Sequence, residues 1–149
     1  MLIPDANMLI YAFRGEFPQH EKAHAWVREA LAGKENIGIA VPVELAFLRL
    51  MTKPLGPLPA ASWESAWAFV TALTSAPLVR RVHAGQGHSA IFAGLCGAAG
   101  KVGDEVTDFY IAALAIEHCA TLVSADQDFR QIAGLKWKNP FGPQTVAEP

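Results

Sequence analysis

The sequence predicts an α/β fold: a three-layer α/β/α domain whose mainly parallel sheet of about five strands is flanked by helices. Two observations predict it. Short apolar runs, typical of buried strands, alternate along the chain with longer segments of helical periodicity. The chain has 149 residues, of which 52% are hydrophobic and 17% charged. This is enough apolar material for one buried core and argues against disorder.

The first half of the chain contains clear start and stop signals. Apolar residues recur every three or four positions between His20 and Ala32, and Gly33 ends that helix. Pro42 suits the first turn of a helix, and Ser62 suits an N-cap, while three prolines make 54–59 a loop. The expected elements are strands at 2–4 and 37–41 and helices at 7–13, 20–32, 42–51 and 62–74.

The second half continues the alternation. The expected elements are strands at 78–82, 121–123 and 135–137, helices at 88–99 and 104–119, and a turn or short helix opening at Asp126. The helix at 88–99 is rich in Ala and Gly and is expected to be closely packed, and we expect Asp104 to cap the next one. We divide the chain into a domain at 1–140 and a Pro-rich C-terminal tail at 141–149, with fraying from Asn139.

Composition narrows the class of protein. No apolar run is long enough to span a membrane, and the N-terminus lacks the pattern of a secretory signal. Cys96 and Cys119 show neither metal-site spacing nor the density of a disulfide scaffold, and Cys119 reads as a core residue. We therefore expect a cytoplasmic protein. The net charge of −2 argues against nonspecific binding of polyanions, unless several acids are gathered around bound cations.

Four acids fall where an α/β sheet places a ligand. Asp5 ends the first strand, and Glu44 lies in the first turn after the second. Asp126 follows the fourth strand by two residues, and Asp108 lies in the first turns of the helix leading into that strand. Ligands bind beyond the carboxyl ends of parallel strands, so these side chains are expected to converge.

Clustered carboxylates repel one another, and a divalent cation removes that penalty. Oxygen ligands of this kind suit Mg²⁺ or Mn²⁺, which activate water and stabilise the charges of a phosphodiester under attack. Any one of these acids taken alone is more often a helix cap or a surface charge. The spacing leaves both interpretations open.

Three segments resemble the PIN-domain family and, within it, the VapC-type ribonuclease toxins of type II toxin–antitoxin systems. Residues 4–12 resemble its opening D-x-N-hydrophobic signature. Residues 107–129 resemble the block D-x-x-I-A-A-x-A followed by A-x-L-V-T/S-x-D-x-D-F, and residues 134–140 resemble the closing strand of a VapC subgroup. The resemblance covers essentially the whole chain, although 53–101 matches only in pattern.

The resemblance implies a role for each matching residue. Asp5, Asp108 and Asp126 match the first, third and fourth acids of the family's catalytic metal site. Glu44 matches the second acid, in a segment resembling E-x-x-aromatic-x-R-hydrophobic, although it lies close to Pro42. The resemblance also implies accessory roles for Asp128, Ser124 and Asn7. Arg49 shares a helix with Glu44 and is for that reason the best candidate among the basic residues for a contact to RNA or to the antitoxin.

The activity implied is that of a Mg²⁺- or Mn²⁺-dependent endoribonuclease that hydrolyses RNA phosphodiesters with a metal-activated water. The implied partners are the RNA substrate, a cognate antitoxin protein and a second copy in a homodimer. One alternative is a PIN-fold binding or regulatory module without cleavage activity. Another is a phosphatase with Asp5 as nucleophile, which is disfavoured because Asn7 stands where a general acid is needed.

Other polar and aromatic residues carry weaker signals. Arg14, Arg81 and further basic residues fit either phosphate contacts or solvated surface. Trp63 and Trp67 lie at helical spacing with other apolar residues, so core or dimer packing is favoured over base stacking. The histidines show neither zinc spacing nor a nucleophile partner, and no catalytic role is assigned to them.

Overall fold

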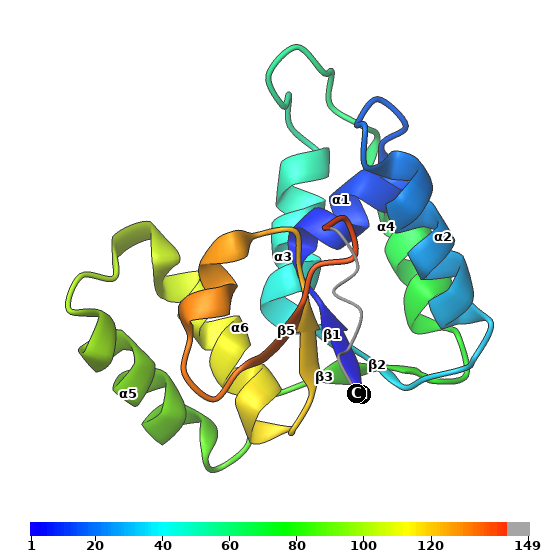
Figure 1. Ribbon diagram of the computed structural model, residues 1–149. Coiled ribbons are helices and arrows are strands. Elements are labelled where there is room, and N and C mark those ends of the chain that lie inside the picture. The colour runs from blue at the N-terminus through cyan, green and yellow to red at the C-terminus, as the bar shows by residue number, and fades with distance from the viewer. Residues whose placement is uncertain (143–149) are drawn as a thin grey trace.

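The computed structural model describes residues 1–142 and contains a five-stranded sheet in the order β3-β2-β1-β4-β5 (Figure 1). All neighbouring strands pair in parallel, as the alternating pattern predicted. β5 is an edge strand, also as predicted. The strands are β1 (Leu2–Pro4), β2 (Ile37–Ala40), β3 (Val79–Val82), β4 (Thr121–Val123) and β5 (Lys136–Lys138).

Six α-helices connect the strands. They are α1 (Ala6–Phe13), α2 (His20–Leu31), α3 (Val41–Met51), α4 (Trp63–Thr74), α5 (His88–Ala99) and α6 (Val106–Glu117), with short 3-10 helices at Gly103–Glu105 and Gln127–Gln131. In Figure 1, α5 and α6 lie on one side of the sheet, and α1, α2 and α4 lie on the other. The predicted three-layer arrangement is therefore confirmed.

Strand register positions the residues that follow β1 and β4. Pro4 pairs with Val123, so Asp5 and Ser124 emerge side by side at the carboxyl ends of the two central strands. The amide of Asp5 donates to the Val123 carbonyl oxygen at 2.9 Å, which extends the pairing by one residue. The edge of the sheet where the acids were expected is thus fixed by backbone hydrogen bonds.

The core lies against both faces of the sheet. Ile3 and Leu122 are fully buried, and every residue of β2 is buried. Phe47 packs edge-on against Phe13, with ring centroids 5.4 Å apart, and lies 5.2 Å from Phe69, so α1, α3 and α4 share one aromatic cluster. Burial of this aromatic and aliphatic surface is the main favourable term that holds α1, α3 and α4 together.

Local signals in the sequence set several helix starts. Pro42 lies in the first turn of α3, and the Ser62 hydroxyl accepts a hydrogen bond from the Ser65 amide at 3.1 Å, as predicted. The expected cap at Asp104 is wrong. That residue lies inside the 3-10 turn, and the N-cap position of α6 is Glu105, whose side chain makes no capping hydrogen bond.

The structure also tests three packing expectations. α5 packs closely against α6, as expected, although His88 is its only buried residue. The expectation that Cys119 is a core residue is wrong: it is exposed, because it follows the end of α6 in a left-handed conformation with φ 50°. Trp63 and Trp67 are 52% and 41% exposed, with their rings stacked at 5.5 Å on α4, so they are not core residues, and packing in a dimer stays a prediction.

The chain stays packed beyond Asn139. The Phe141 amide donates to Asn139 Oδ1 at 2.9 Å, and the Phe141 ring meets Tyr11 edge-on at 5.7 Å. The fraying expected from Asn139 is thus not seen in 139–142, while the tail at 143–149 lies outside the described residues. Within 1–142, no helix is long and apolar enough to cross a membrane.

Candidate metal centre

Asp5 is held firmly at the carboxyl end of β1. It is only 9% exposed and is the N-cap residue of α1, where Oδ1 accepts from the Ala6 amide at 2.7 Å. Oδ2 accepts from Ser124 Oγ at 2.8 Å and from Asn7 Nδ2 at 2.9 Å. Burial raises the pKa of Asp5 despite these donors, and the negative charge of Asp126 raises it further.

Ser124 and Asn7 link the ends of β1 and β4. The buried Ser124 hydroxyl donates to Asp5 and accepts from Asn7 Nδ2 at 2.9 Å and from the Asp126 amide at 3.1 Å. Asn7 Oδ1 accepts from the Ala125 amide at 3.2 Å. The network leaves neither side chain free to rotate, so it fixes both the Asp5 carboxylate and the backbone that carries Asp126.

Asp108 lies in the first turn of α6, where the negative charges of the other acids act on its carboxyl group. Its pKa is raised to about 6, first by partial burial and then by the negative charges of Asp5 and Asp126, with smaller contributions from Glu105 and Asp128. Asp108, Asp126 and Asp128 line one hollow, and the Ser124 hydroxyl bonds to both Asp5 and the Asp126 amide. The structure therefore brings these four acids to the same end of the sheet, as expected.

The acids open into a hollow of about 500 Å³. Asp108, Asp126, Asp128 and Glu105 form its acidic part, and its apolar wall is contributed by Leu95, Phe109, Phe129 and Ile132, among others. Asp126 caps the short helix beside it, accepting from the Asp128 amide at 2.9 Å. Capping alone explains that one bond, but it does not explain why four acids face one hollow.

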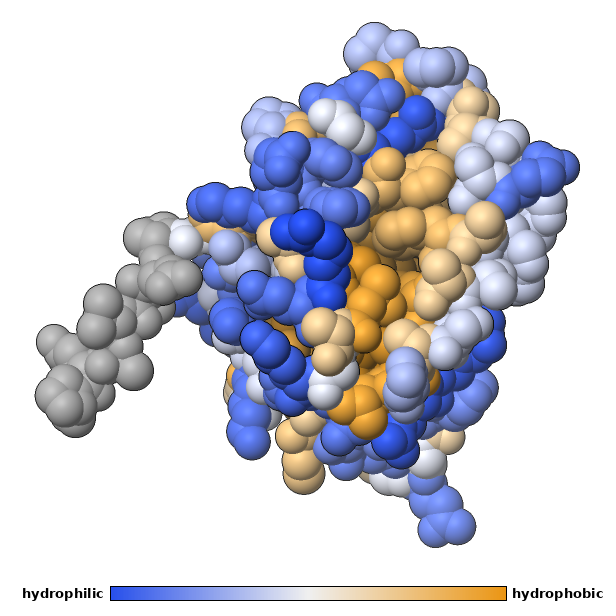
Figure 2. Space-filling view, turned by 90° about the vertical axis from the view of Figure 1, so that its right-hand side faces the viewer, coloured by the Kyte–Doolittle hydropathy of each residue, from blue (hydrophilic) through white to orange (hydrophobic). Residues whose placement is uncertain are grey.

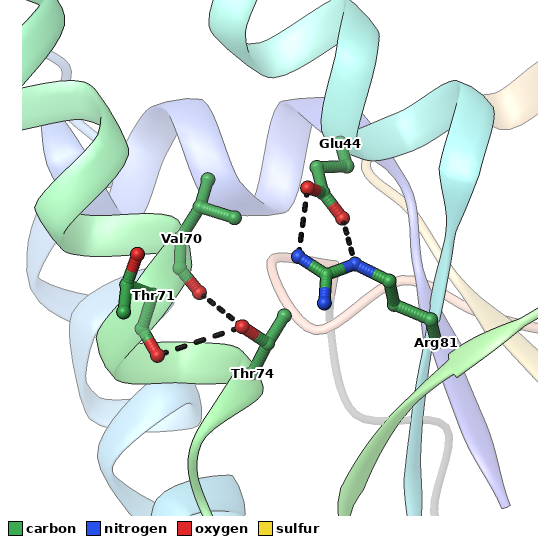
Figure 3. Close-up of polar contacts among 5 residues, drawn as sticks. All are labelled: Glu44, Val70, Thr71, Thr74 and Arg81. Carbon is green, nitrogen blue, oxygen red and sulfur yellow. Dashed lines mark hydrogen bonds and ion pairs between the residues drawn. The ribbon is translucent and has the colours of Figure 1, made fainter.

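Glu44 is differently placed. Its carboxylate accepts from Arg81 Nε at 2.8 Å and from Arg81 Nη2 at 3.0 Å, in the side-on pairing drawn in Figure 3. It is 8% exposed, and its charge is not among those that raise the pKa of Asp5 or Asp108. The structure thus pairs Glu44 with β3, near the end of α4, and does not join it to the other acids.

The residues present fit a divalent cation by type, because hard oxygen donors gather where their mutual repulsion is unrelieved. Their positions do not form a ready coordination sphere. Within residues 1–142, no group of three or more Asp, Glu, His or Cys side chains is arranged to hold a metal ion. Binding would need side-chain rotation, most readily of the half-buried Asp108 and the exposed Asp128.

Sequence reasoning did not find Glu105, which lines the acidic hollow and lies three residues before Asp108, a spacing at which residues at the start of a helix share a face. It also did not find the pairing of Arg81 with Glu44, because the two residues are distant in sequence. Of the basic residues considered as phosphate contacts, Arg14 does not lie on the surface: it is buried and donates to the Pro59 carbonyl oxygen. Arg49 is exposed in the last turn of α3.

The model of one known family, the PIN domain, matches residues 2–135. The chain belongs to the PIN-domain family. This PIN domain is 40% identical over 144 residues to "Ribonuclease VapC33" of Mycobacterium tuberculosis, covering 95% of this chain and 99% of that protein. It is 37% identical over 141 residues to "Ribonuclease VapC37" of the same organism, with 94% and 97% of the two chains covered.

A solved structure confirms the fold of this PIN domain. The VapBC2 complex of Rickettsia felis, bound to a DNA fragment from its promoter, superposes with a TM-score of 0.70 at 18% identity. The match covers 93% of this chain and 97% of that one. The predicted membership of the PIN-domain family, and of its VapC-type branch, is confirmed.

Proposed function

We propose that this PIN domain is a metal-dependent endoribonuclease and the toxin of a toxin–antitoxin pair. The observation that carries the proposal is the convergence of Asp5, Asp108 and Asp126 from β1, α6 and the end of β4, with the pKa of Asp108 raised to about 6 by burial and by the charges around it. The relatives at 40% and 37% identity, which carry the name ribonuclease VapC over nearly the whole chain, support the reaction class.

In this proposal Asp5, Asp108 and Asp126 hold Mg²⁺ or Mn²⁺, and Asp128 is an accessory acid. A bound cation supplies activation of a water and stabilisation of the charge that develops on the phosphodiester. Glu44 remains the fourth candidate ligand; to serve, its carboxylate has to share or exchange the two hydrogen bonds from Arg81.

The chain's own residues prepare the site. Ser124 and Asn7 hold the Asp5 carboxylate in one orientation, and burial beside the core keeps bulk water from it. Because the pKa of Asp108 is raised to about 6, this carboxyl holds its proton at mildly acidic pH, and a bound cation would compete with that proton. The apolar wall of the acidic hollow gives an RNA strand a surface beside the charged one.

The partners in this proposal are RNA, a cognate antitoxin and a second copy of the chain, in a cytoplasmic setting. On the face shown in Figure 2, the side of α2 and α4, hydrophobic residues form a band flanked by hydrophilic ones. Leu45 on α3 and Trp63 and Trp67 on α4 are large exposed apolar side chains. Exposed apolar surface of this kind is typical of protein interfaces. Arg49 is the proposed contact to RNA or antitoxin.

The test is RNA cleavage by purified protein with Mg²⁺, with Mn²⁺ and with EDTA. We expect cleavage that needs a divalent metal and is lost in both Asp5→Asn and Asp108→Asn. Asp104→Asn is the matched control, since this exposed acid lies one turn before Asp108 and does not line the hollow. Folded wild-type protein without cleavage in any condition would favour the binding module. Activity that survives EDTA and both substitutions would remove the proposed site.

A further inference from the structure

A second hollow lies beside the acid network. It is an open hollow of about 520 Å³ between α1, the loop that follows α1 and the loop that follows α3. Its lining is mostly apolar: Ile10, Tyr11, Phe17, Leu55, Pro57 and Leu58, with Gly56 at the turn. Asn7 and Glu16 are the polar residues of the lining, and no lysine or arginine is among them. An anionic phosphate group therefore has no cationic partner among the lining residues of this hollow.

The loop that forms one wall is held in place by hydrogen bonds. Leu55 and Leu58 exchange two backbone hydrogen bonds of 3.0 Å, and the Ala61 amide donates to the Met51 carbonyl oxygen at 2.8 Å. Arg14, buried under the loop, donates to the Pro59 carbonyl oxygen. The hollow is thus preformed, which lowers the entropy cost of binding a ligand in it.

Asn7 connects this hollow to the acids. It lines the hollow, its amide nitrogen bonds to Asp5 and Ser124, and its amide oxygen accepts from Ala125, the neighbour of Asp126. The hollow at α1 and the acidic hollow at α6 share no lining residue. Asn7, which lines the hollow at α1 and bonds to Asp5, is therefore the direct link between a group bound at α1 and the proposed metal ligands.

We propose that the hollow at α1 binds one nucleobase of the RNA substrate, adjacent to the phosphodiester that is cut. The proposal rests on the ribonuclease function. Tyr11 and Phe17 pack edge-to-face, with ring centroids 5.1 Å apart, and offer aromatic surface in an apolar slot. Single-stranded RNA is bound in this way, by stacking of unpaired bases on aromatic side chains while charged groups engage the backbone. Bases are flat and uncharged, so they suit a hollow without basic residues.

The test compares an RNA oligonucleotide that the wild type cleaves with copies carrying one abasic ribose on either side of the cut. For the wild type, kcat/KM is expected to fall about tenfold on one abasic copy, the effect of one lost stacking contact. Tyr11→Leu removes an aromatic ring, and Leu58→Glu places a charge in the hollow. Each is expected to lose about tenfold on the intact RNA and to show no further loss on that abasic copy. Phe92→Leu on α5 is the control.

Two results would overturn the proposal. One is Tyr11→Leu and Leu58→Glu proteins, both folded by circular dichroism, that cleave as the wild type does and keep the full abasic penalty. The other is unchanged cleavage combined with weakened inhibition by the antitoxin, which would assign the hollow to a protein partner. Both leave the ribonuclease function intact, because the wild type still cleaves. Wild-type protein that cleaves no RNA would remove both proposals together.

Discussion

Arg81 donates two hydrogen bonds to Glu44, from Nε at 2.8 Å and from Nη2 at 3.0 Å. The pair ties the carboxyl end of β3 to the first turn of α3. Glu44 is nearly buried, whereas the side chain of Arg81 is 42% exposed. The pair can serve structure alone, by holding β3 against α3. A role of Glu44 as a metal ligand would compete with this structural role, because the same carboxylate oxygens would have to bind the metal. The two roles predict different results for the same substitutions.

Glu44→Gln is expected to lower cleavage by about tenfold, the lower end of the usual range for a residue that supports the metal ligands without binding the metal. Asp108→Asn is expected to lower it by about a hundredfold or more, because it removes a charge from the cluster itself. Cleavage rates at saturating Mg²⁺ compare the two directly. Equal losses would place Glu44 among the metal ligands and show that it leaves Arg81 when metal binds.

Arg81→Met is expected to reduce the free energy of unfolding by about 1–2 kcal/mol, because Glu44 is left nearly buried without its charged donor. Urea denaturation measures this. The double variant Glu44→Gln with Arg81→Met is the control: it removes the stranded charge and should regain part of the loss. A double variant that is as unstable as the sum of the single variants would show that the two residues do not interact.

Ser124→Ala removes a buried hydroxyl that bonds to Asp5 and to the Asp126 amide. We expect cleavage to fall about tenfold, because Asp5 loses a donor and its pKa rises further. The pH at which cleavage becomes half-maximal should move upward with it. Ser124→Thr keeps the hydroxyl and should keep that pH unchanged. An unchanged pH profile in Ser124→Ala would mean that Ser124 does not act through Asp5.

The pKa of Asp108 gives a pH dependence of stability in metal-free protein. A carboxyl whose pKa is raised on folding binds its proton more tightly in the native state, so its contribution to stability is lost as pH rises. Between about pH 4 and 6, the wild type should therefore lose stability relative to Asp108→Asn. Above pH 6 we expect the variant to melt about 3 °C higher, a value discounted for half-exposure. Mg²⁺ should remove the difference by stabilising only the wild type.

Glu117, at the other end of α6, should behave in the opposite way. Its carboxylate accepts from the Gly85 and Gly87 amides at 2.9 and 3.0 Å, and these bonds, that of Gly85 foremost, lower its pKa. Its contribution to stability is present at neutral pH and is lost as pH falls below the ordinary value of 4.5. Glu117→Gln should thus melt below the wild type at pH 7, and the two should converge in acid. A difference that is constant with pH would mean that ionisation of Glu117 does not matter.

Much of the fold was readable from the sequence because its signals are local. Short apolar runs separated by helices require a parallel sheet, and the end of a parallel strand fixes where Asp5 and Ser124 emerge. The Glu44–Arg81 pair was not readable, since it depends on the register of β3 against β2 across 37 residues of chain. The exposure of Cys119 and of α5 depends on which elements find neighbours, and hydrophobic periodicity does not reveal that.

The most direct test of the metal centre is Mn²⁺ binding followed by electron paramagnetic resonance at pH 7. We expect wild-type protein and Asp104→Asn to bind Mn²⁺ alike, and Asp5→Asn and Asp108→Asn to bind it at least about tenfold more weakly. Mg²⁺ should compete with the bound Mn²⁺. Equal binding by all four proteins, or none by the wild type, would contradict the account, because it would mean that the acids at the ends of β1 and β4 do not hold a cation.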